Sequence, residues 1–226
     1  RHQDRLVEAL AWLAEAREHR GDLEGAIGQR ERQIGLIEQF SSGRPEAAEL
    51  KRKLMNSERA VGRLFVARGD RAQGLEHLRR AVSLAGELIR TEPNNTEWGQ
   101  VAAAGTFELG QLQLATGDLE QAGSSARAGC ELASRLAERD SSVVRWRAEL
   151  RGRCLELRAR LALGRNAVLE AEAVAGEAVR LARAELGRAP SADNQVALAA
   201  AQLLVGDVAE RRGDRAGAAR AWRAAL

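Results

Sequence analysis

The residues that most often carry chemistry are few in this sequence, and they are not arranged as a metal site. The three histidines, His2, His19 and His77, lie within no His-Glu-x-x-His pattern, and no Cys-x-x-Cys pair is present. Those are spacings that place two metal ligands on one helix face or in one turn. The sequence therefore predicts no metal site. His19 lies near the end of an expected helix, and we interpret it as a solvated cation that the helix dipole stabilises.

The two cysteines, Cys130 and Cys154, lie on consecutive expected helices. They are at similar distances from the bend expected near Asp140, so their side chains could face each other. Two interpretations stay open, a redox pair and two small thiols buried in tight helix packing, and we favour the buried thiols. Two cysteines are too few for a secreted disulfide scaffold, which favours a cytoplasmic location.

Nucleotide chemistry and nucleophilic catalysis are not indicated. No Gly-x4-Gly-Lys phosphate loop occurs, and neither Lys51 nor Lys53 lies in a setting typical of a nucleophile or phosphate ligand. The serine pairs at 41–42 and 124–125 have no histidine at a spacing that suggests a catalytic pair. The sequence predicts no catalytic residue, no enzyme activity and no cofactor.

The composition disfavours nucleic acid and membrane as partners. The 226 residues include 35 Lys+Arg and 32 Asp+Glu, which gives a formal charge of +3. This is close to neutral, whereas a nucleic-acid binder concentrates an excess of positive charge on one face. No stretch approaches the ~20 apolar residues of a membrane span. Since nearly all the basic residues are arginine, the composition is typical of a GC-rich bacterial genome.

A regular internal repeat organises the chain. Gly-Asp pairs stand at Gly21-Asp22, Gly69-Asp70, Gly117-Asp118 and Gly213-Asp214, with Gly164-Arg165 in the remaining gap. All three prolines, Pro45, Pro93 and Pro190, share one phase of this period. The period is about 48 residues, and a fixed period of this order is typical of stacked repeat arrays. In each pair we expect the Gly to end one helix and the Asp to cap the next.

Between these turns apolar residues recur at helical spacing, and the sequence predicts an all-α fold. We expect helices at about 1–20, 22–41, 45–68, 70–91, 95–116, 118–139, 142–163, 166–188, 191–212 and 214–226. They form about five antiparallel pairs in one array over residues 1–226, with repeats at about 1–44, 45–92, 93–140, 141–189 and 190–226. Because the chain begins and ends within helical patterns, we expect it to be a fragment of a longer protein.

The residues around each turn resemble those of the tetratricopeptide repeat (TPR). An apolar-small pair precedes the turn Gly at positions eight and seven before it, as at Leu13-Ala14, Val61-Gly62, Leu109-Gly110 and Val205-Gly206. A small residue follows at the fifth position, at Ala26, Gly74, Ala122 and Ala218, although the fourth repeat has Leu169 there. A small residue also follows at the twelfth position, at Ala81, Gly129, Gly176 and Ala225, although the first repeat has Gln33 there. The family's unit is about 34 residues, so the longer period here indicates a variant with longer helices. The resemblance implies a superhelical α-solenoid whose first helices line a concave groove.

The resemblance also implies which residues line that groove. If the family's phases carry over, its side chains lie at positions 13, 10, 6, 3 and 2 before each turn Gly, with Gly164 as the fourth turn residue. These phases, extended by one turn, select Arg52, Asn56, Arg59, Arg63, Phe107, Gln111, Arg147, Arg151 and Arg158. Such a partly basic groove would suit an acidic peptide segment or a free C-terminus. The alternative, that Arg is simply the common surface residue here, stays open.

The tryptophans allow a structural and a binding interpretation. Trp98 and Trp146 lie one full period apart and so share one phase of the repeat. This favours core packing for the four, which also include Trp12 and Trp222, although exposed Trp often marks an interface.

The function indicated is a non-enzymatic scaffold that binds a peptide or a partner domain. The alternative is a regulatory or sensor arm of a larger bacterial signalling protein, whose ATPase, kinase, protease or DNA-binding effector lies outside this sequence. In that case the partner is another domain of the same polypeptide.

Overall fold

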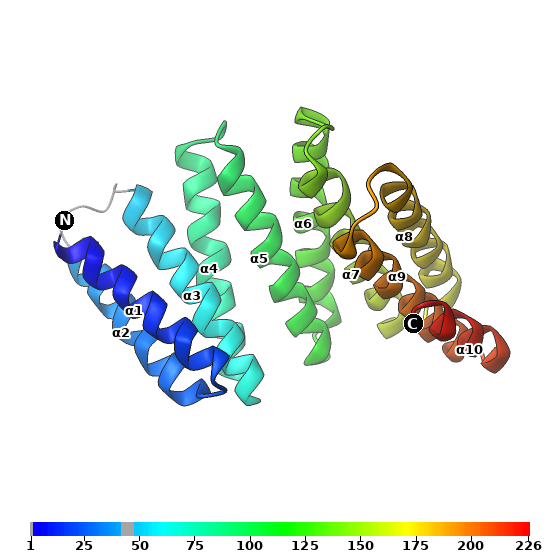
Figure 1. Ribbon diagram of the computed structural model, residues 1–226, viewed down its shortest axis with the longest axis horizontal. Helices are drawn as coiled ribbons and strands as arrows, with labels where there is room; N and C mark the ends of the chain where they lie inside the picture. Colours follow the sequence, from blue (N-terminus) through cyan, green and yellow to red (C-terminus); the bar gives the residue numbers. More distant parts are fainter. Residues whose placement is uncertain (1, 42–47) are drawn as a thin grey trace. The chain divides into compact units, whose positions relative to one another are not determined.

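The chain is all-α throughout the part that the computed structural model describes, residues 2–41 and 48–226 (Figure 1). It divides into two compact units, Arg1–Gly105 and Thr106–Leu226, and each is described by itself. The division falls within helix α5 (Thr96–Ala115). None of the described helices is both long and apolar enough to cross a bilayer.

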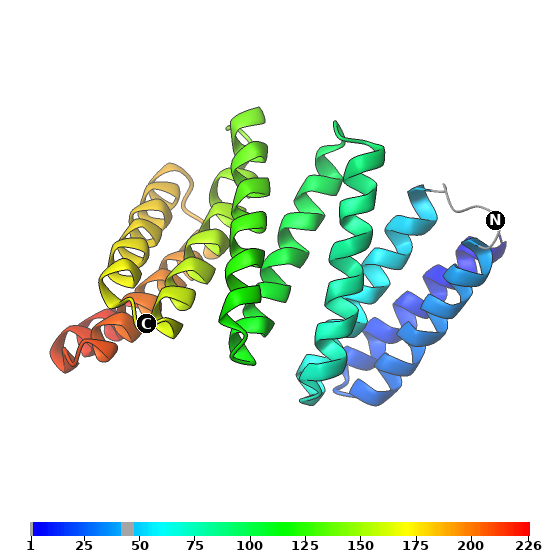
Figure 2. The same cartoon turned by 180° about the vertical axis from the view of Figure 1, so that it is seen from behind.

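The first unit consists of two antiparallel helix pairs and the first half of α5 (Figures 1 and 2). Its helices are α1 (His2–His19), α2 (Leu23–Ser41), α3 (Ala48–Arg68) and α4 (Arg71–Thr91). Each helix packs on the next along the chain. The helix predicted from residue 45 is confirmed from Ala48, whereas Pro45 and the rest of 42–47 lie outside the described residues.

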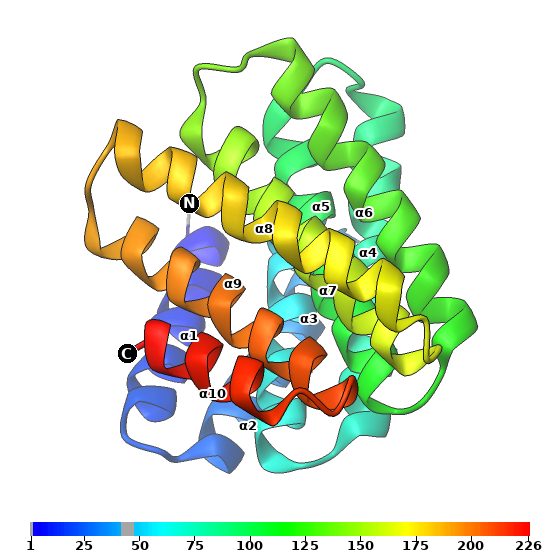
Figure 3. The same ribbon diagram turned by 90° about the vertical axis from the view of Figure 1, so that its right-hand side faces the viewer.

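The second unit continues the same pattern from the second half of α5. Its elements are α6 (Leu119–Arg139), the π-helical segment η1 (Arg145–Leu150), α7 (Arg151–Gly164), α8 (Val168–Arg188), α9 (Ala192–Arg211) and α10 (Arg215–Ala224). Here α8 packs against both α7 and α9, and α10 packs against α9 (Figure 3). Elsewhere the predicted helix ends agree with the described ones within two residues. That all five repeats form one domain stays a prediction.

The turn between the helices of each pair depends on one residue in the left-handed region. The four predicted turn glycines, Gly21, Gly69, Gly117 and Gly213, have φ of 77°, 97°, 83° and 81°. The aspartate after each glycine caps the next helix, as Asp70 does by accepting the backbone N–H of Gln73 at 3.1 Å. Both roles predicted for the Gly-Asp pairs are therefore confirmed.

The fourth turn differs from the prediction. The residue with positive φ is Asn166, at 60°, and the next helix follows directly with Ala167 in the capping position. Gly164, which the Gly-Asp spacing selected, is the last residue of α7. Asn is the side chain that best tolerates this backbone region after Gly. Counted from Gly117, this turn comes one residue later than the period of the earlier repeats, and the step from it to Gly213 is one residue shorter.

The helix predicted at 142–163 begins at Val144 and starts with the π-helical segment η1. Trp98 and Trp146 hold the same phase, but the stretch from Trp146 to Asn166 is one residue longer than the stretch from Trp98 to Gly117. A π-turn closes its hydrogen bond over five residues instead of four. The segment η1 therefore absorbs the one extra residue of this repeat and lets the rest of the helix keep its packing.

Small residues allow the helices of the second unit to pack closely. A Cβ atom added at Gly129 of α6 would lie 2.7 Å from the ring of Phe107, which is itself fully buried. One added at Gly110 would lie 3.2 Å from the Cβ of Ser125. The short side chains expected at these phases are therefore needed for contact between α5 and α6.

A buried carboxylate joins the helices of the second pair. Glu58 of α3 is fully buried and lies 2.6 Å from Nδ1 of His77 and 3.2 Å from Nη1 of Arg80, both on α4. His77 also stacks on Phe65, with ring centroids 5.2 Å apart. One of the three histidines thus has a structural place in the α3–α4 interface.

We expect Gly129→Ala to lower the free energy of unfolding by about 1–3 kcal/mol, because the new methyl group overpacks against Phe107. The control is Gly176→Ala in α8, where the methyl group meets only the end of Arg180 at 3.4 Å. The control should be neutral or stabilising by up to about 1 kcal/mol. Urea unfolding followed by circular dichroism measures both, and equal effects would contradict the packing described.

Candidate functional site

The second unit contains a pocket of about 710 Å³ between η1–α7 and α9, with α8 as its third wall. We call it the α7–α9 pocket. Its apolar lining comes from Val144, Ala148, Ala178, Leu181, Ala182, Ala189, Ala197, Ala200, Ala201 and Leu204. A mostly apolar hollow of this volume is large enough for a small ligand or for several side chains of a peptide.

One face of η1 and α7 forms the first wall. Its lining residues are Arg145, Ala148, Glu149, Gly152, Arg153 and Glu156. Steps of three and four residues place side chains on the same side of a helix. A Cβ atom at Gly152 would meet no heavy atom within 4 Å, so the α7 backbone is open toward the pocket.

The charged lining of the pocket is more acidic than basic. It includes the four carboxylates of Glu149, Glu156, Glu185 and Asp193 and the two guanidinium groups of Arg145 and Arg153. The guanidinium groups are engaged within the unit: Nε of Arg145 lies 3.4 Å from Glu149, and Nη2 of Arg153 lies 3.7 Å from Glu108 of α5. Three of the four carboxylates are also paired: Glu149 with Arg145, Glu156 with Nε of Arg160 at 3.0 Å, and Glu185 with two arginines. The pocket is therefore mainly apolar, and its charges are largely balanced within the unit.

Glu185, which lines the pocket from α8, is held by two arginines. Its carboxylate, 4% exposed, accepts hydrogen bonds from Nε and Nη2 of Arg147 at 2.9 and 2.7 Å and from Nη1 of Arg188 at 2.7 Å. The hydrogen bonds from Arg147 lower the pKa of Glu185 below its ordinary value, and they raise the pKa of Arg147. This pair fixes the start of the η1–α7 wall against α8.

No protein-family model and no curated protein sequence matches the chain. Solved structures do resemble it. BtubC (BKLC) from P. vanneervenii has a TM-score of 0.72 at 17% identity, over 97% of this chain and 78% of that one. A putative kinesin light chain with nearly identical TPR-like repeats from Podosopora anserina has a TM-score of 0.67 at 16% identity, over 100% and 95%. This is a TPR-like fold.

Counting from Asn166 instead of Gly164 changes which residues of the fourth repeat occupy the TPR groove positions. Positions 13, 10 and 6 before Asn166 are Arg153, Glu156 and Arg160. The first two line the α7–α9 pocket, and Arg160 lies 4.0 Å from Asp207 of α9. Sequence reasoning missed these residues because it counted from Gly164. The signal that could have found them was Asn166, which stands directly after Gly164-Arg165.

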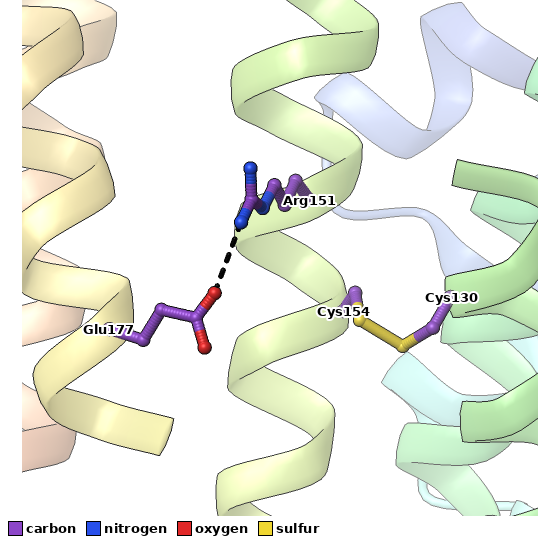
Figure 4. The surroundings of a disulfide bond; sticks show 4 residues. All are labelled: Cys130, Arg151, Cys154 and Glu177. Carbon is purple, nitrogen blue, oxygen red and sulfur yellow. Dashed lines mark hydrogen bonds and ion pairs between the residues drawn. A yellow bond between two sulfur atoms is a disulfide. The ribbon is translucent and has the colours of Figure 1, made fainter. Parts of the chain in front are cut away.

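The three arginines predicted from Gly164 lie on another face. A shift of two residues is about 200° around a helix. Arg151 donates to Glu177 of α8 at 3.2 Å (Figure 4). Arg147 binds Glu185, so it also contacts α8. Arg158 is exposed and lines a second, smaller pocket beside α6. None of the three lines the α7–α9 pocket.

The other predicted groove residues have mixed surroundings. In α3, Arg52 forms a two-pronged hydrogen bond with Glu49 at 2.6 and 2.8 Å, which raises the pKa of Arg52 and lowers that of Glu49. Asn56 and Arg63 are exposed and Arg59 is half-buried. That these α3 residues bind a partner stays a prediction.

In α5 the same phases give one correction. Gln111 is half-buried, but Phe107 is fully buried, because its ring fills the space above Gly129. The side chain of Phe107 therefore belongs to the core of the second unit and cannot line a surface groove.

The cysteines also differ from the favoured expectation of two buried thiols. Cys130 of α6 and Cys154 of α7 do face each other, and they form a disulfide with Cα atoms 5.2 Å apart (Figure 4). Figure 4 shows Cys154 directed toward α6, whereas Arg151, one turn earlier, is directed toward Glu177 of α8. Both positions of α7 are thus occupied by contacts with neighbouring helices, Cys154 with α6 and Arg151 with α8.

The tryptophans divide between the two interpretations. Trp98 is 6% exposed and its indole N–H donates to Glu92 at 3.1 Å, which confirms core packing for this residue. Trp146 and Trp222 are half-buried. Trp12 of α1 is 72% exposed, so core packing is wrong for it.

Replacing Asn166 tests the corrected turn. Asn166→Gly should leave stability unchanged or raise it by up to about 1 kcal/mol, because Gly adopts positive φ without steric cost. Asn166→Ala should destabilise by about 1–2 kcal/mol. Chemical unfolding of the three proteins gives the comparison, and equal stability of the Gly and Ala variants would contradict a left-handed residue here.

Arg147→Gln should lower the free energy of unfolding near neutral pH, because it removes one of the two arginine partners of the Glu185 carboxylate. Since the pKa of Glu185 is lowered in the folded chain, the stabilisation is complete above its ordinary value and is lost as pH falls through the folded value. The difference between the parent chain and the variant should therefore shrink on acidification. Unfolding curves between pH 7 and pH 3 measure it, and a constant difference would contradict the pairing.

Proposed function

We propose that the chain is a non-enzymatic protein-interaction scaffold whose α7–α9 pocket binds a segment of a partner protein. The observation that supports this is the pocket itself, about 710 Å³ and mostly apolar, which lies between successive first helices of a repeat array. Apolar side chains that enter it would gain about 25 cal/mol per Å² of buried area. A few such anchors carry most of the binding energy of an interface.

The lining of the pocket supports one kind of partner segment. It is mainly apolar, and three of its four carboxylates are paired with arginines of the unit, so it favours an apolar segment. An acidic peptide held by the predicted basic groove is a separate prediction, which depends on Arg151 and Arg158 rather than on the pocket. The two can be distinguished with the same set of variants.

The proposal places the interaction in the cytoplasm and assigns the chain no catalytic role. The partner is either a separate protein or another domain of the same polypeptide. The second case corresponds to the regulatory or sensor arm of a larger bacterial signalling protein. Both use the same mode of binding, and the pocket supports them equally.

The proposal can be tested by selecting binders from a displayed library of random short peptides. Ala197→Trp fills the pocket from its exposed α9 wall, and Ala184→Trp adds the same side chain to an exposed position of α8 outside the pocket. Selected peptides should bind the Ala197→Trp variant at least about tenfold more weakly and the Ala184→Trp variant equally well, as measured by isothermal titration calorimetry.

The charge-reversed variant Arg151→Glu/Arg158→Glu serves as the second comparison. Binding that survives this reversal supports the pocket. Peptides that lose affinity on charge reversal but not with Ala197→Trp would overturn the pocket and move the site to the predicted basic groove.

A further inference from the structure

The disulfide between Cys130 and Cys154 joins two successive helix pairs. Cys130 belongs to α6, the second helix of the third repeat, and Cys154 to α7, the first helix of the fourth. The sequence between them contains the bend after α6 and the segment η1. The bond is therefore the one covalent tie between these repeats in the described chain, apart from the backbone.

The two cysteines differ in exposure. Cys154 is 8% exposed and lies on the buried side of α7. Cys130 is half-buried and lines a pocket of about 350 Å³ formed by α6, α7 and the start of α8. We call it the Cys130 pocket. Cys130 lines this pocket and Cys154 does not, so Cys130 is the more accessible of the two cysteines to a small reagent.

The Cys130 pocket is basic. Its charged lining consists of Arg127, Arg158, Arg165 and Glu170. Arg127 lies one turn before Cys130 on the same face of α6. Arg165 is held in place: its Nη2 donates to the carbonyl of Leu119 at 3.3 Å and occupies the space that a Cβ atom at Gly123 would need. Arginines near a cysteine stabilise the thiolate, and they attract carboxylates.

We propose that Cys130 and Cys154 form a reversible thiol–disulfide switch, in which Cys130 exchanges with an anionic small-molecule thiol or its disulfide. This goes beyond the proposed scaffold function and does not depend on the α7–α9 pocket. The small-molecule disulfide is the oxidant and its carboxylates are bound by the arginines of the Cys130 pocket. Reversible disulfides of this kind are compatible with a reducing cytoplasm.

Oxidation proceeds in two exchange steps. The Cys130 thiolate attacks one sulfur of the small disulfide, which forms a mixed disulfide and releases one small thiolate. The Cys154 thiol loses its proton and attacks the sulfur of Cys130, which forms the protein disulfide and releases the second small thiolate. Two protein thiols and one small disulfide thus become one protein disulfide and two small thiols. Reduction is the reverse, and its first step is attack by a small thiolate on the accessible Cys130.

The first experiment compares the two sulfurs in the full chain, with oxidised glutathione as the probe. In Cys154→Ser only Cys130 is free, and in Cys130→Ser only Cys154 is free. Mass spectrometry follows formation of the mixed disulfide at neutral pH. Cys130 should react at least about tenfold faster than Cys154, and Cys154 reacting as fast as Cys130 would overturn the proposal. Circular dichroism checks that both variants remain helical.

The second experiment tests the arginines in the Cys154→Ser background. Arg127→Gln/Arg158→Gln should slow the reaction severalfold and move its pH dependence toward higher pH. The matched control is Arg135→Gln, which removes an exposed arginine of α6 that pairs with Glu131 outside the pocket. Equal rates in the two arginine variants would overturn the role of the Cys130 pocket.

The third experiment uses the unmodified cysteine pair, so that it does not depend on buried substitutions. Glutathione should reduce the disulfide of the folded chain, and oxidised glutathione should restore it, as followed by alkylation of free thiols. The oxidised form should melt roughly 5–10 °C higher than the reduced form. A disulfide that glutathione reduces only after the chain is unfolded would mean a permanent structural cross-link and would overturn the switch.

Discussion

The structure depends on one residue per helix pair that adopts positive φ. Four of these residues are glycines and the fifth is Asn166. Because consecutive helical residues are separated by about 100°, the position of this residue decides which face of the preceding helix meets its partner. The repeat period, the small residues of the interfaces and the location of any binding surface all follow from where the left-handed residues lie.

Much of the fold could be predicted because Gly-Asp is a local and nearly unambiguous turn pattern. Where the pattern was intact, the helices were placed within two residues, and the small residues at Gly110 and Gly129 lie in the expected interfaces. The fourth repeat could not be placed in this way, because its glycine is the last residue of a helix and an asparagine makes the turn. In this repeat only the small residues after the turn keep the spacing of the other repeats. Ala171 and Ala178 lie at the fifth and twelfth positions after Asn166, and both are buried.

The candidate binding site was the less predictable part, since a two-residue error turns a helix to its opposite face. It was also obscured by the abundance of arginine. Arg147 and Arg151 pair with carboxylates of the neighbouring helix. The number of arginines in the sequence therefore says little about the surface that a partner would contact. The spacing of the cysteines indicated that their side chains could face each other. The choice between two thiols and a disulfide depends on side-chain directions, which only the packed helices define.

The segment η1 shows how such an array can accommodate a change of a single residue. The extra residue is taken up where the helix begins, beside the Arg147–Glu185 pair, and the hairpin that ends the helix keeps its geometry. Each unit of a repeat protein contacts only its neighbours, so a local change in one unit can leave the others in place. Here a lineage could vary the wall of one pocket by one insertion and leave the neighbouring interfaces unchanged.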